Sequence, residues 1–312
     1  MRRNVVRLVL PLMLLTAACG TGDTPTAPAK QGTLADVTVS GPTDKKPTVD
    51  FKAPLSFATT MGKVVEKGPG KGDAVQADSV VTVDYVAINA SDATEYDSTW
   101  SRGEPATFGV SQVIPGFAMG LTGDHAGDRV LIAVASKDGY DPVGNGSSIR
   151  KGDSLVLVVD VRSVSSPIKD VAGTKMSPPA TVPSLVYDDQ DAPTGFKATD
   201  KTPESVDKLG VYPVIKGNGP VVKKGQTIVV NYLGQVYPDG AVFDESYSGG
   251  QPVSFQLGEV IPGWTKGLVG QTVGSRVILV VPSADGYGAQ GQGSTIPPDA
   301  DLIFVIDLLQ AY

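Results

Sequence analysis

The chain has 312 residues but only one cysteine, Cys19, and one histidine, His125. A single cysteine excludes an internal disulfide framework and a cysteine-rich metal site. A single histidine excludes a multi-histidine metal site and argues against a Ser–His–Asp triad. The net charge of −7 argues against a nucleic-acid partner and against adsorption to anionic lipid through a basic patch. We therefore expect no metal and no cofactor, and a function that needs neither thiol nor imidazole chemistry.

The N-terminus has the pattern of an export signal. Arg2 and Arg3 precede an apolar run over 5–15, which is too short to span a bilayer and has the shape of a signal peptide. Small residues directly before Cys19 resemble the bacterial lipoprotein signal, which implies a signal peptide over 1–19 and a lipid on Cys19. The alternative is an ordinary secretory signal with an incidental cysteine. Either reading predicts an exported, extracytoplasmic protein, and lipidation implies anchoring to the outer face of the cytoplasmic membrane.

The remainder of the chain contains one long repeat. Residues 80–161 recur 147 residues later without a gap, in pairs such as Asp97 with Asp244 and Arg129 with Arg276. An offset this long indicates two copies of one domain. We expect domains over 51–164 and 183–312, joined by a Ser-, Pro- and Lys-rich linker over 165–182. Residues 20–50 hold few large apolar side chains, so we expect a flexible tether there.

Each copy alternates short strand patterns with one short helical turn. In the second copy, the run over 275–282 is apolar and β-branched, as in a buried strand, and Gly263–Leu268 has the pattern of a helical turn. Glycine-rich and aromatic loops separate these elements. The sequence therefore predicts an α+β fold, with an antiparallel sheet wrapped around one short α-helix in each copy.

An ordered set of motifs in the second copy carries a family resemblance. Its members are Tyr232, Phe243-Asp244, Glu259-Val260-Ile261-Pro262-Gly263-Trp264, Tyr287-Gly288 and Ile296-Pro297-Pro298. Together they resemble the FKBP family of peptidyl-prolyl cis–trans isomerases, over about 210–312 and, more weakly, over about 60–163. The resemblance implies a tandem-domain isomerase that acts on X–Pro bonds.

The composition is compatible with that chemistry. Rotating an X–Pro bond costs about 18–20 kcal/mol because amide resonance is lost at the twisted geometry. No covalent bond is made or broken, so the catalyst needs no acid, base or nucleophile. It must bind the twisted amide better than either planar form, and an apolar, water-poor pocket favours the less polar twisted form.

The resemblance also assigns roles to residues of the second copy. It implies catalytic roles for the Asp244 carboxylate, the Tyr287 hydroxyl and the Ile261 backbone N–H. The substrate-binding positions that it implies are Tyr232, Phe243, Val260, Trp264, Ile296 and Phe304. Gly249 departs from the family pattern, because many members have there an arginine that pairs with the aspartate. Read one at a time, Trp264 and Phe304 are equally well explained as core residues.

The first copy keeps the site in altered form. Its counterparts are Tyr85, Tyr96, Asp97, Val113, Ile114, Phe117, Tyr140 and Leu157. Phe117 replaces the tryptophan, and Arg150-Lys151 replaces the proline pair. Arg102 is present here, so an Asp97–Arg102 pair is expected. Catalysis and simple binding both stay open for this copy. His125 aligns with Thr272 in a turn and is interpreted as a solvated loop residue.

Three functional classes follow from these patterns. The first is a peptidyl-prolyl isomerase that assists folding of secreted or envelope proteins, with unfolded or partly folded proline-containing polypeptides as partners. The second is a non-catalytic chaperone or scaffold for proline-containing segments, with the first copy as the purer example. The third, a lipoprotein that delivers a small solute, is disfavoured by the ungapped repeat. Binding of macrolide inhibitors is implied by the resemblance alone.

Overall fold

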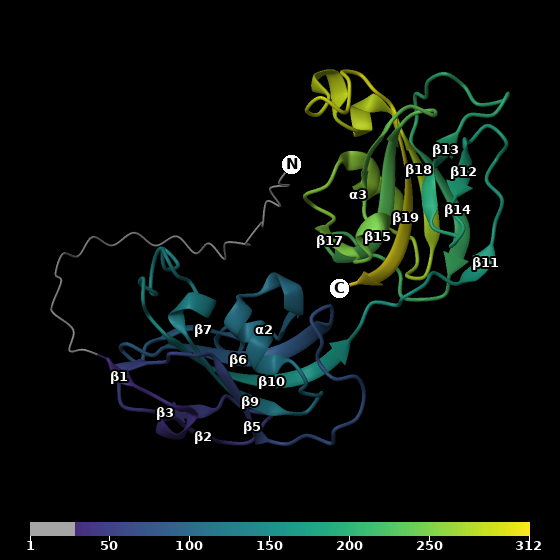
Figure 1. The fold of residues 1–312 in the computed structure, drawn as a ribbon. Helices are drawn as coiled ribbons and strands as arrows, with labels where there is room; N and C mark the ends of the chain where they lie inside the picture. The colour runs from purple at the N-terminus through teal and green to yellow at the C-terminus, as the bar shows by residue number, and fades with distance from the viewer. Residues whose placement is uncertain (1–28) are drawn as a thin grey trace. The chain divides into compact units, whose positions relative to one another are not determined.

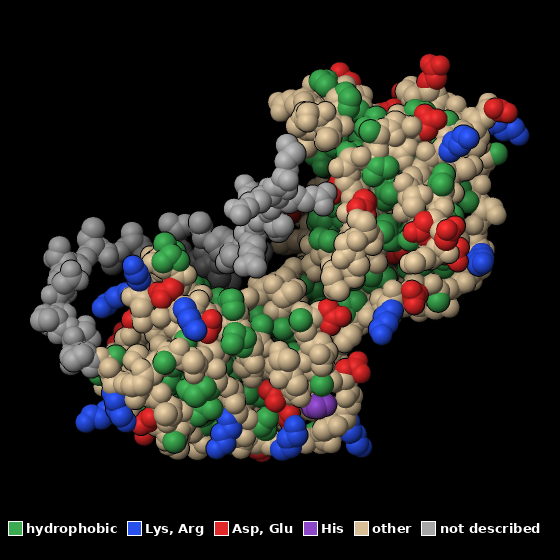
Figure 2. All heavy atoms as spheres, in the orientation of Figure 1, with side chains coloured by type: hydrophobic (Ala, Val, Ile, Leu, Met, Phe, Trp, Pro, Cys, Tyr) green, Lys and Arg blue, Asp and Glu red, His purple; other side chains and the backbone are tan. Residues whose placement is uncertain are grey.

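The computed structural model describes residues 29–312, which divide after Ser166 into two compact units. We call residues 29–166 domain 1 and residues 167–312 domain 2 (Figure 1). The predicted signal peptide and Cys19 lie outside the described residues. No helix in 29–312 is long and apolar enough to cross a membrane. On the face shown in Figure 2, acidic and basic side chains are interspersed on both domains.

Domain 1 is built on a six-stranded antiparallel sheet in the order β5-β9-β10-β6-β7, with β8 paired to β6. Its strands are β5 Met61–Glu66, β6 Val80–Asn89, β7 Glu95–Ser98, β8 Ala106–Gly109, β9 Arg129–Val134 and β10 Leu155–Ser165. Its helices are α1 Thr99–Arg102 and α2 Pro115–Leu121, with 3₁₀ turns at η1 Leu34–Asp36, η2 Val110–Gln112 and η3 Ser136–Asp138.

Domain 2 repeats this plan with a seven-stranded antiparallel sheet in the order β11-β14-β18-β19-β15-β16, with β17 paired to β15. Its sheet strands are β11 Gly173–Lys175, β14 Gly210–Gly217, β15 Thr227–Val236, β16 Val242–Glu245, β17 Val253–Gln256, β18 Arg276–Val281 and β19 Leu302–Ala311. Its helix is α3 Pro262–Leu268, with 3₁₀ turns at η4 Tyr247–Gly249, η5 Ser283–Asp285 and η6 Gly288–Gln290.

The predicted combination of an antiparallel sheet and a short helix is found in both domains, and strands dominate over the three α-helices of 29–312. Proline at the first position starts both α2 and α3, because its fixed φ suits a helix and its missing N–H is not needed there. Gly263 lets α3 approach the sheet closely, since a Cβ there would lie 2.5 Å from Val281 Cγ1. The helix thereby presents its tryptophan to the sheet.

Both faces of each main sheet are buried, which explains the continuous apolar runs. In β18, Val277, Leu279 and Val281 pack in the core that includes α3, whereas Ile278 and Val280 belong to a second core on the opposite face. Successive side chains of a strand point to opposite faces. A strand that is buried on both faces therefore cannot alternate apolar and polar residues.

The second core lies under an added layer of short strands, most of which lies outside the predicted strands. In domain 1 the layer comprises β1 Lys30–Gln31, η1, β2 Thr38–Ser40, β3 Thr48–Asp50 and β4 Leu55–Ser56. Strands β2 and β3 form an antiparallel hairpin, and β1 pairs with β4 in parallel. Leu55 and Phe57 are buried with Leu131 and Val158 of the sheet. The expectation of a flexible tether over 20–50 is therefore wrong for residues 30–50.

Arg129 explains why this polar segment is ordered. Its guanidinium is 1% exposed and makes two hydrogen bonds to Asp160, at 2.6 and 2.7 Å. It also donates to the backbone carbonyls of Gly41, Pro42 and Lys45. A buried cation must be paired and fully hydrogen-bonded, and the β2–β3 loop supplies the remaining acceptors.

Domain 2 carries a similar layer, which includes part of the predicted linker. Strands β12 Ser184–Tyr187 and β13 Pro193–Lys197 form its hairpin, and Phe196 packs on the outer face of the sheet. Strand β11 pairs with β14 although all three of its residues are exposed. The expected linker over 165–182 is therefore largely attached to domain 2, by backbone hydrogen bonds that side-chain patterns do not encode.

Candidate functional site

A pocket of about 260 Å³ opens beside α3 in domain 2. It is lined by Tyr232, Phe243, Asp244, Phe255, Glu259, Val260, Ile261, Trp264, Tyr287 and Phe304. These residues come from β15, β16, β17, the loop before α3, α3 itself, the loop after β18, and β19. The structure thus gathers eight of the nine site residues expected in the second copy around one hollow.

Trp264 forms the centre of an aromatic cluster. Its ring meets Tyr232, Phe255 and Phe304 edge-on, with ring centroids 5.3–5.5 Å apart. Such edge-to-face pairs stabilise aromatic packing beyond the area that they bury. Trp264 is 4% exposed, and its indole Nε1 is buried without a hydrogen-bond partner among the described residues. The pocket floor is therefore rigid and apolar, with one unused donor.

A glycine on β15 makes room for the aromatic wall. A Cβ on Gly234 would lie 2.7 Å from the rings of both Phe243 and Phe304, so a larger residue would displace the wall. The two rings pack edge to face at 5.7 Å. Register places Gly234 opposite Asp244 of β16, which brings the carboxylate to the same end of the pocket.

The polar groups of the pocket are held by short contacts. The Tyr232 hydroxyl donates to Asp244 Oδ2 at 2.5 Å, and the Glu245 backbone N–H donates to Asp244 Oδ1 at 3.0 Å. Burial and the adjacent Asp244 carboxylate raise the pKa of Tyr232 well above its usual range. Burial, and then Asp244, also raise the pKa of Tyr287. Both hydroxyls therefore stay protonated at physiological pH.

The backbone at the start of α3 offers a further donor. Ile261 precedes the helix, and its carbonyl accepts the N–H groups of Trp264 and Thr265. Its own N–H has no hydrogen-bond partner among residues 29–312. It is thus available to an acceptor in the pocket beside it.

Three residues distinguish the structure from the expected site. Ile296 is 3% exposed and packs in the core next to α3, and it does not line the pocket. Phe255 and Glu259 line it but were not among the expected residues. Phe255 could have been found from its regular spacing with Val253 and Leu257 along a strand that leads into the Glu259–Trp264 motif.

Domain 1 assembles its own version of the cluster. The apolar core beside α2 gathers the expected Tyr85, Tyr96, Val113, Ile114, Phe117, Tyr140 and Leu157. Phe117 meets Tyr85 and Phe108 edge-on, with ring centroids 5.9 and 5.3 Å apart. The Tyr85 hydroxyl donates to Asp97, as Tyr232 does to Asp244. Burial, and then the bond to Asp97, raise the pKa of Tyr85 to about 12.

The clearest difference in domain 1 is a cation at the rim. Arg102 forms the expected ion pair with Asp97. Its Nη2 also donates to the Tyr85 hydroxyl at 3.2 Å, and the guanidinium lies 5.4 Å from the centre of the Tyr85 ring. The Asp97 carboxylate is thus neutralised in domain 1, at the place where domain 2 has Gly249.

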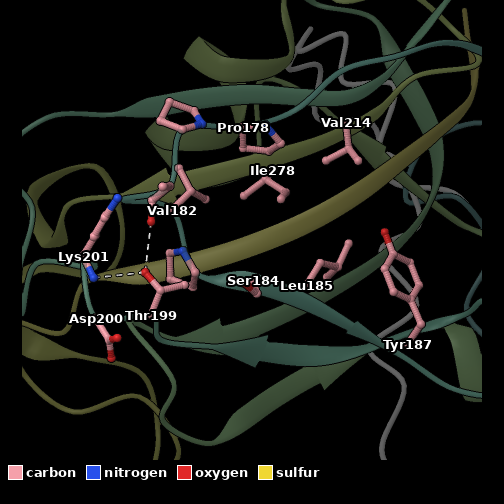
Figure 3. Close-up of a pocket in the computed structure, with 13 residues that line it drawn as sticks. Pro178, Val182, Ser184, Leu185, Tyr187, Thr199, Asp200, Lys201, Val214 and Ile278 are labelled. Carbon is pink, nitrogen blue, oxygen red and sulfur yellow. Dashed lines mark hydrogen bonds between the residues drawn. The ribbon is translucent and has the colours of Figure 1, made fainter.

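A larger cavity, of about 520 Å³, lies elsewhere in domain 2, between the added layer and the outer face of the sheet. Pro178, Val182, Leu185 and Ile278 give it an apolar wall, and residues 199–201 close one side (Figure 3). Tyr187 is its one aromatic residue, and its lining shares no residue with the pocket beside α3. We therefore place the candidate site at the smaller pocket, where the aromatic and polar groups converge.

Comparison with known proteins identifies the same regions. A family model described as "FKBP-type peptidyl-prolyl cis-trans isomerase" matches residues 71–162 and 219–309. FK506-binding protein 2 of Kluyveromyces lactis is 47% identical over 88 residues, which are 28% of this chain and 63% of that protein. An FK506-binding protein of Streptomyces anulatus is 42% identical over 104 residues, or 32% of this chain and 84% of that protein. The crystal structure of FkpA from Escherichia coli matches at 42% identity and a TM-score of 0.31, covering 33% of this chain and 47% of that one.

Proposed function

Because this chain belongs to the FKBP-type peptidyl-prolyl cis–trans isomerase family, we propose that it accelerates the cis–trans isomerisation of X–Pro bonds, with domain 2 as the catalytic domain. The observation that carries the proposal is the aromatic pocket of domain 2, whose mouth brings together Asp244, Tyr287 and the free Ile261 N–H. The uncatalysed reaction takes tens to hundreds of seconds, slow enough to limit folding.

The proposed mechanism assigns each group a part. The proline ring rests on Trp264 between Tyr232 and Phe304, which removes water from the amide. The Ile261 N–H and the Tyr287 hydroxyl donate to carbonyls of the bound segment and orient it. Asp244, held by Tyr232, faces the amide that twists. These contacts lower the barrier only insofar as they are stronger with the twisted amide than with the planar one.

A short-peptide assay tests this function. The purified full chain is expected to accelerate cis–trans isomerisation of tetrapeptides of the form Ala-X-Pro-Phe, and FK506, after which two relatives are named, is expected to inhibit it. Peptides this short isolate the pocket from any extended client surface. No acceleration, together with slower aggregation of an unfolded client protein, would contradict the isomerase proposal and favour a chaperone.

The second candidate function, binding without catalysis, applies to domain 1. Phe117 replaces the tryptophan floor with a smaller ring, and Arg150-Lys151 replaces the proline pair that follows Ile296 in domain 2. A domain that binds proline-containing segments without isomerising them would keep the apolar cluster and would not need the tryptophan floor. Domain 1 would then raise the local concentration of a client beside domain 2.

The proposed clients are unfolded or partly folded proline-containing proteins outside the cytoplasm. The proposed location outside the cytoplasm rests on the N-terminal sequence, in which small residues precede Cys19. One acyl chain binds a membrane only marginally, so stable anchoring requires more than one. In a bacterial host, the chain is expected to incorporate a labelled fatty acid, and the Cys19→Ser variant is expected to lose this label. Equal labelling of Cys19→Ser would contradict the lipid anchor.

A further inference from the structure

The rim of the domain 2 pocket carries two carboxylates without a paired cation among the described residues. Asp244 and Glu259 both line the pocket, and both are exposed. In the described part of domain 2, the ion pairs are Lys266–Asp285 and Arg276–Asp307, and neither includes a rim carboxylate. The hydroxyl that contacts Asp244 belongs to Tyr232 and is neutral. The pocket mouth is therefore negatively charged.

Domain 1 provides an internal reference for this charge. At the positions 147 residues earlier, domain 1 has Arg102 where domain 2 has Gly249, and Gln112 where domain 2 has Glu259. Arg102 pairs with Asp97, so the rim of the domain 1 cluster has no net charge from these positions. The two copies share the aromatic cluster and differ in the electrostatics of its edge.

This difference acts on the residues that flank a bound proline. The proline ring enters the apolar floor, so its neighbours lie at the rim, near Asp244 and Glu259. An exposed pair of opposite charges typically stabilises by about 0.2–1 kcal/mol, or about 1.4- to 5-fold in affinity, and a like pair destabilises similarly. Each of the two carboxylates acts twice, by attracting the cationic segment and by repelling the anionic one. At about 1.5- to 1.8-fold per contact, near the weak end of that range, together they separate the two segments by about five- to tenfold.

We propose that the domain 2 pocket selects X–Pro segments with lysine or arginine next to the proline, that Glu259 together with Asp244 determines this selection, and that domain 1 does not share it. The inference rests on the proposed function, because it assumes that the pocket receives an X–Pro segment. It adds to that function a class of preferred client sites, namely prolines in cationic stretches of polypeptide.

The test measures kcat/KM on charge-matched peptides. Domain 1 is silenced in the full chain by Asp97→Ala with Tyr140→Phe, so that domain 2 is observed alone. Two peptide series, Ala-X-Pro-Phe and Ala-Pro-X-Phe, carry lysine, glutamine or glutamate at X. In at least one series, lysine is expected to exceed glutamate by about five- to tenfold at low salt, with glutamine between. The ratio is expected to shrink at about 1 M salt, where the screening length falls to about 3 Å.

Two substitutions give domain 2 the rim residues of domain 1. Glu259→Gln and Gly249→Arg are each expected to lower the lysine-to-glutamate ratio, and together to bring it to about 1–2. A Cβ on Gly249 would have nothing within 4 Å, so a side chain can start there without a clash. Glu204→Gln is the matched control, because it removes one exposed charge between β13 and β14, outside the pocket lining. It is expected to leave the ratio unchanged.

The outcomes separate the two proposals. Acceleration of the glutamine peptides with a lysine-to-glutamate ratio below about 2 in both series would overturn the charge selection and leave the isomerase function intact. A ratio that Glu259→Gln and Gly249→Arg do not change would also overturn it. If no peptide is accelerated, the proposed function fails, and the dissociation constants of the same peptides by calorimetry decide the selection: tighter lysine peptides support it, and equal affinities overturn it.

Discussion

Replacing Asp244 by alanine and Tyr287 by phenylalanine in one chain is expected to lower the isomerase kcat/KM of domain 2 by about 100-fold. A polar contact made by a charged group such as Asp244 contributes about 1.5–3 kcal/mol, and a neutral hydrogen bond such as that of Tyr287 contributes about 0.5–1.5 kcal/mol. Each 1.4 kcal/mol of transition-state stabilisation is a factor of about ten in rate. Two such contacts made more strongly to the twisted amide give a loss of this size. The assay uses the chain with domain 1 silenced and an Ala-Gln-Pro-Phe peptide.

The matched control is Asp200→Ala with Tyr212→Phe, which removes a carboxylate and a hydroxyl from the same domain. Asp200 lines the larger cavity and Tyr212 packs on the outer face of the sheet, so neither reaches the pocket beside α3. This variant is expected to keep its full rate. If the Asp244/Tyr287 variant folds, as judged by its circular dichroism, and keeps more than half of the rate, the two side chains are not the catalytic groups.

The second large effect concerns stability. Arg129→Ala is expected to lower the free energy of unfolding of domain 1 by about 3–5 kcal/mol, because it leaves the buried Asp160 carboxylate without its partner. It also removes the donors to Gly41, Pro42 and Lys45, so the β2–β3 loop loses its attachment. Denaturant unfolding measures the loss, and hydrogen exchange is expected to show faster exchange over 30–50 and in β9 and β10.

Lys30→Ala serves as the reference for an ordinary ion pair. The Lys30 side chain is 68% exposed and pairs with Asp36 within the same segment, and exposed pairs contribute at most about 1 kcal/mol. An Arg129→Ala protein that is no less stable than Lys30→Ala would show that the buried pair does not hold the added layer. Unchanged exchange over 30–50 would show the same.

Those parts of the fold that depend on side-chain periodicity could be predicted from the sequence. The ungapped repeat established the equivalence of the two copies. The helical turn predicted over Gly263–Leu268 lies in α3, and the equivalent segment of the first copy forms α2. Residues 30–50 and 173–175 were missed because much of their order depends on backbone groups, although Val37, Val39 and Val49 also pack on the outer face of the sheet. All three residues of β11 are exposed, and Arg129 binds the backbone carbonyls of three residues, so their side chains take no part in these bonds.

A sequence signal for the added layer was nevertheless present. Pro47-Thr48 followed by Phe51-Lys52-Ala53 recurs as Pro193-Thr194 followed by Phe196-Lys197-Ala198, with one residue fewer between the two parts. The two parts of the motif recur at offsets of 146 and 145 residues (193 − 47 and 196 − 51), so a search for ungapped pairs at the constant offset of 147 does not find them. In the structure Thr48 and Pro193-Thr194 lie in the second strand of a hairpin on the outer face of the sheet of each domain.

The candidate site was predictable to the extent that its residues occur in linear motifs. Val260, Ile261 and Trp264 follow one another along the chain, whereas Phe304 and Tyr232 meet Trp264 only because β15 and β19 pair in register. Ile296 shows the limit of this approach. It lies in a recognisable motif, yet it points into the core, and only the three-dimensional packing reveals this.

The second core, on the outer face of the sheet, sets a lower limit on the length of a fragment that can fold as one domain. A fragment of domain 1 trimmed to residues 71–162 would lack the layer that covers Val86, Ile88, Leu131, Val156 and Val158. These side chains would then form a continuous apolar surface exposed to water, and surfaces of this kind drive self-association. Such a fragment would precipitate even though its pocket residues were all present, and its insolubility would be mistaken for a lack of catalytic activity.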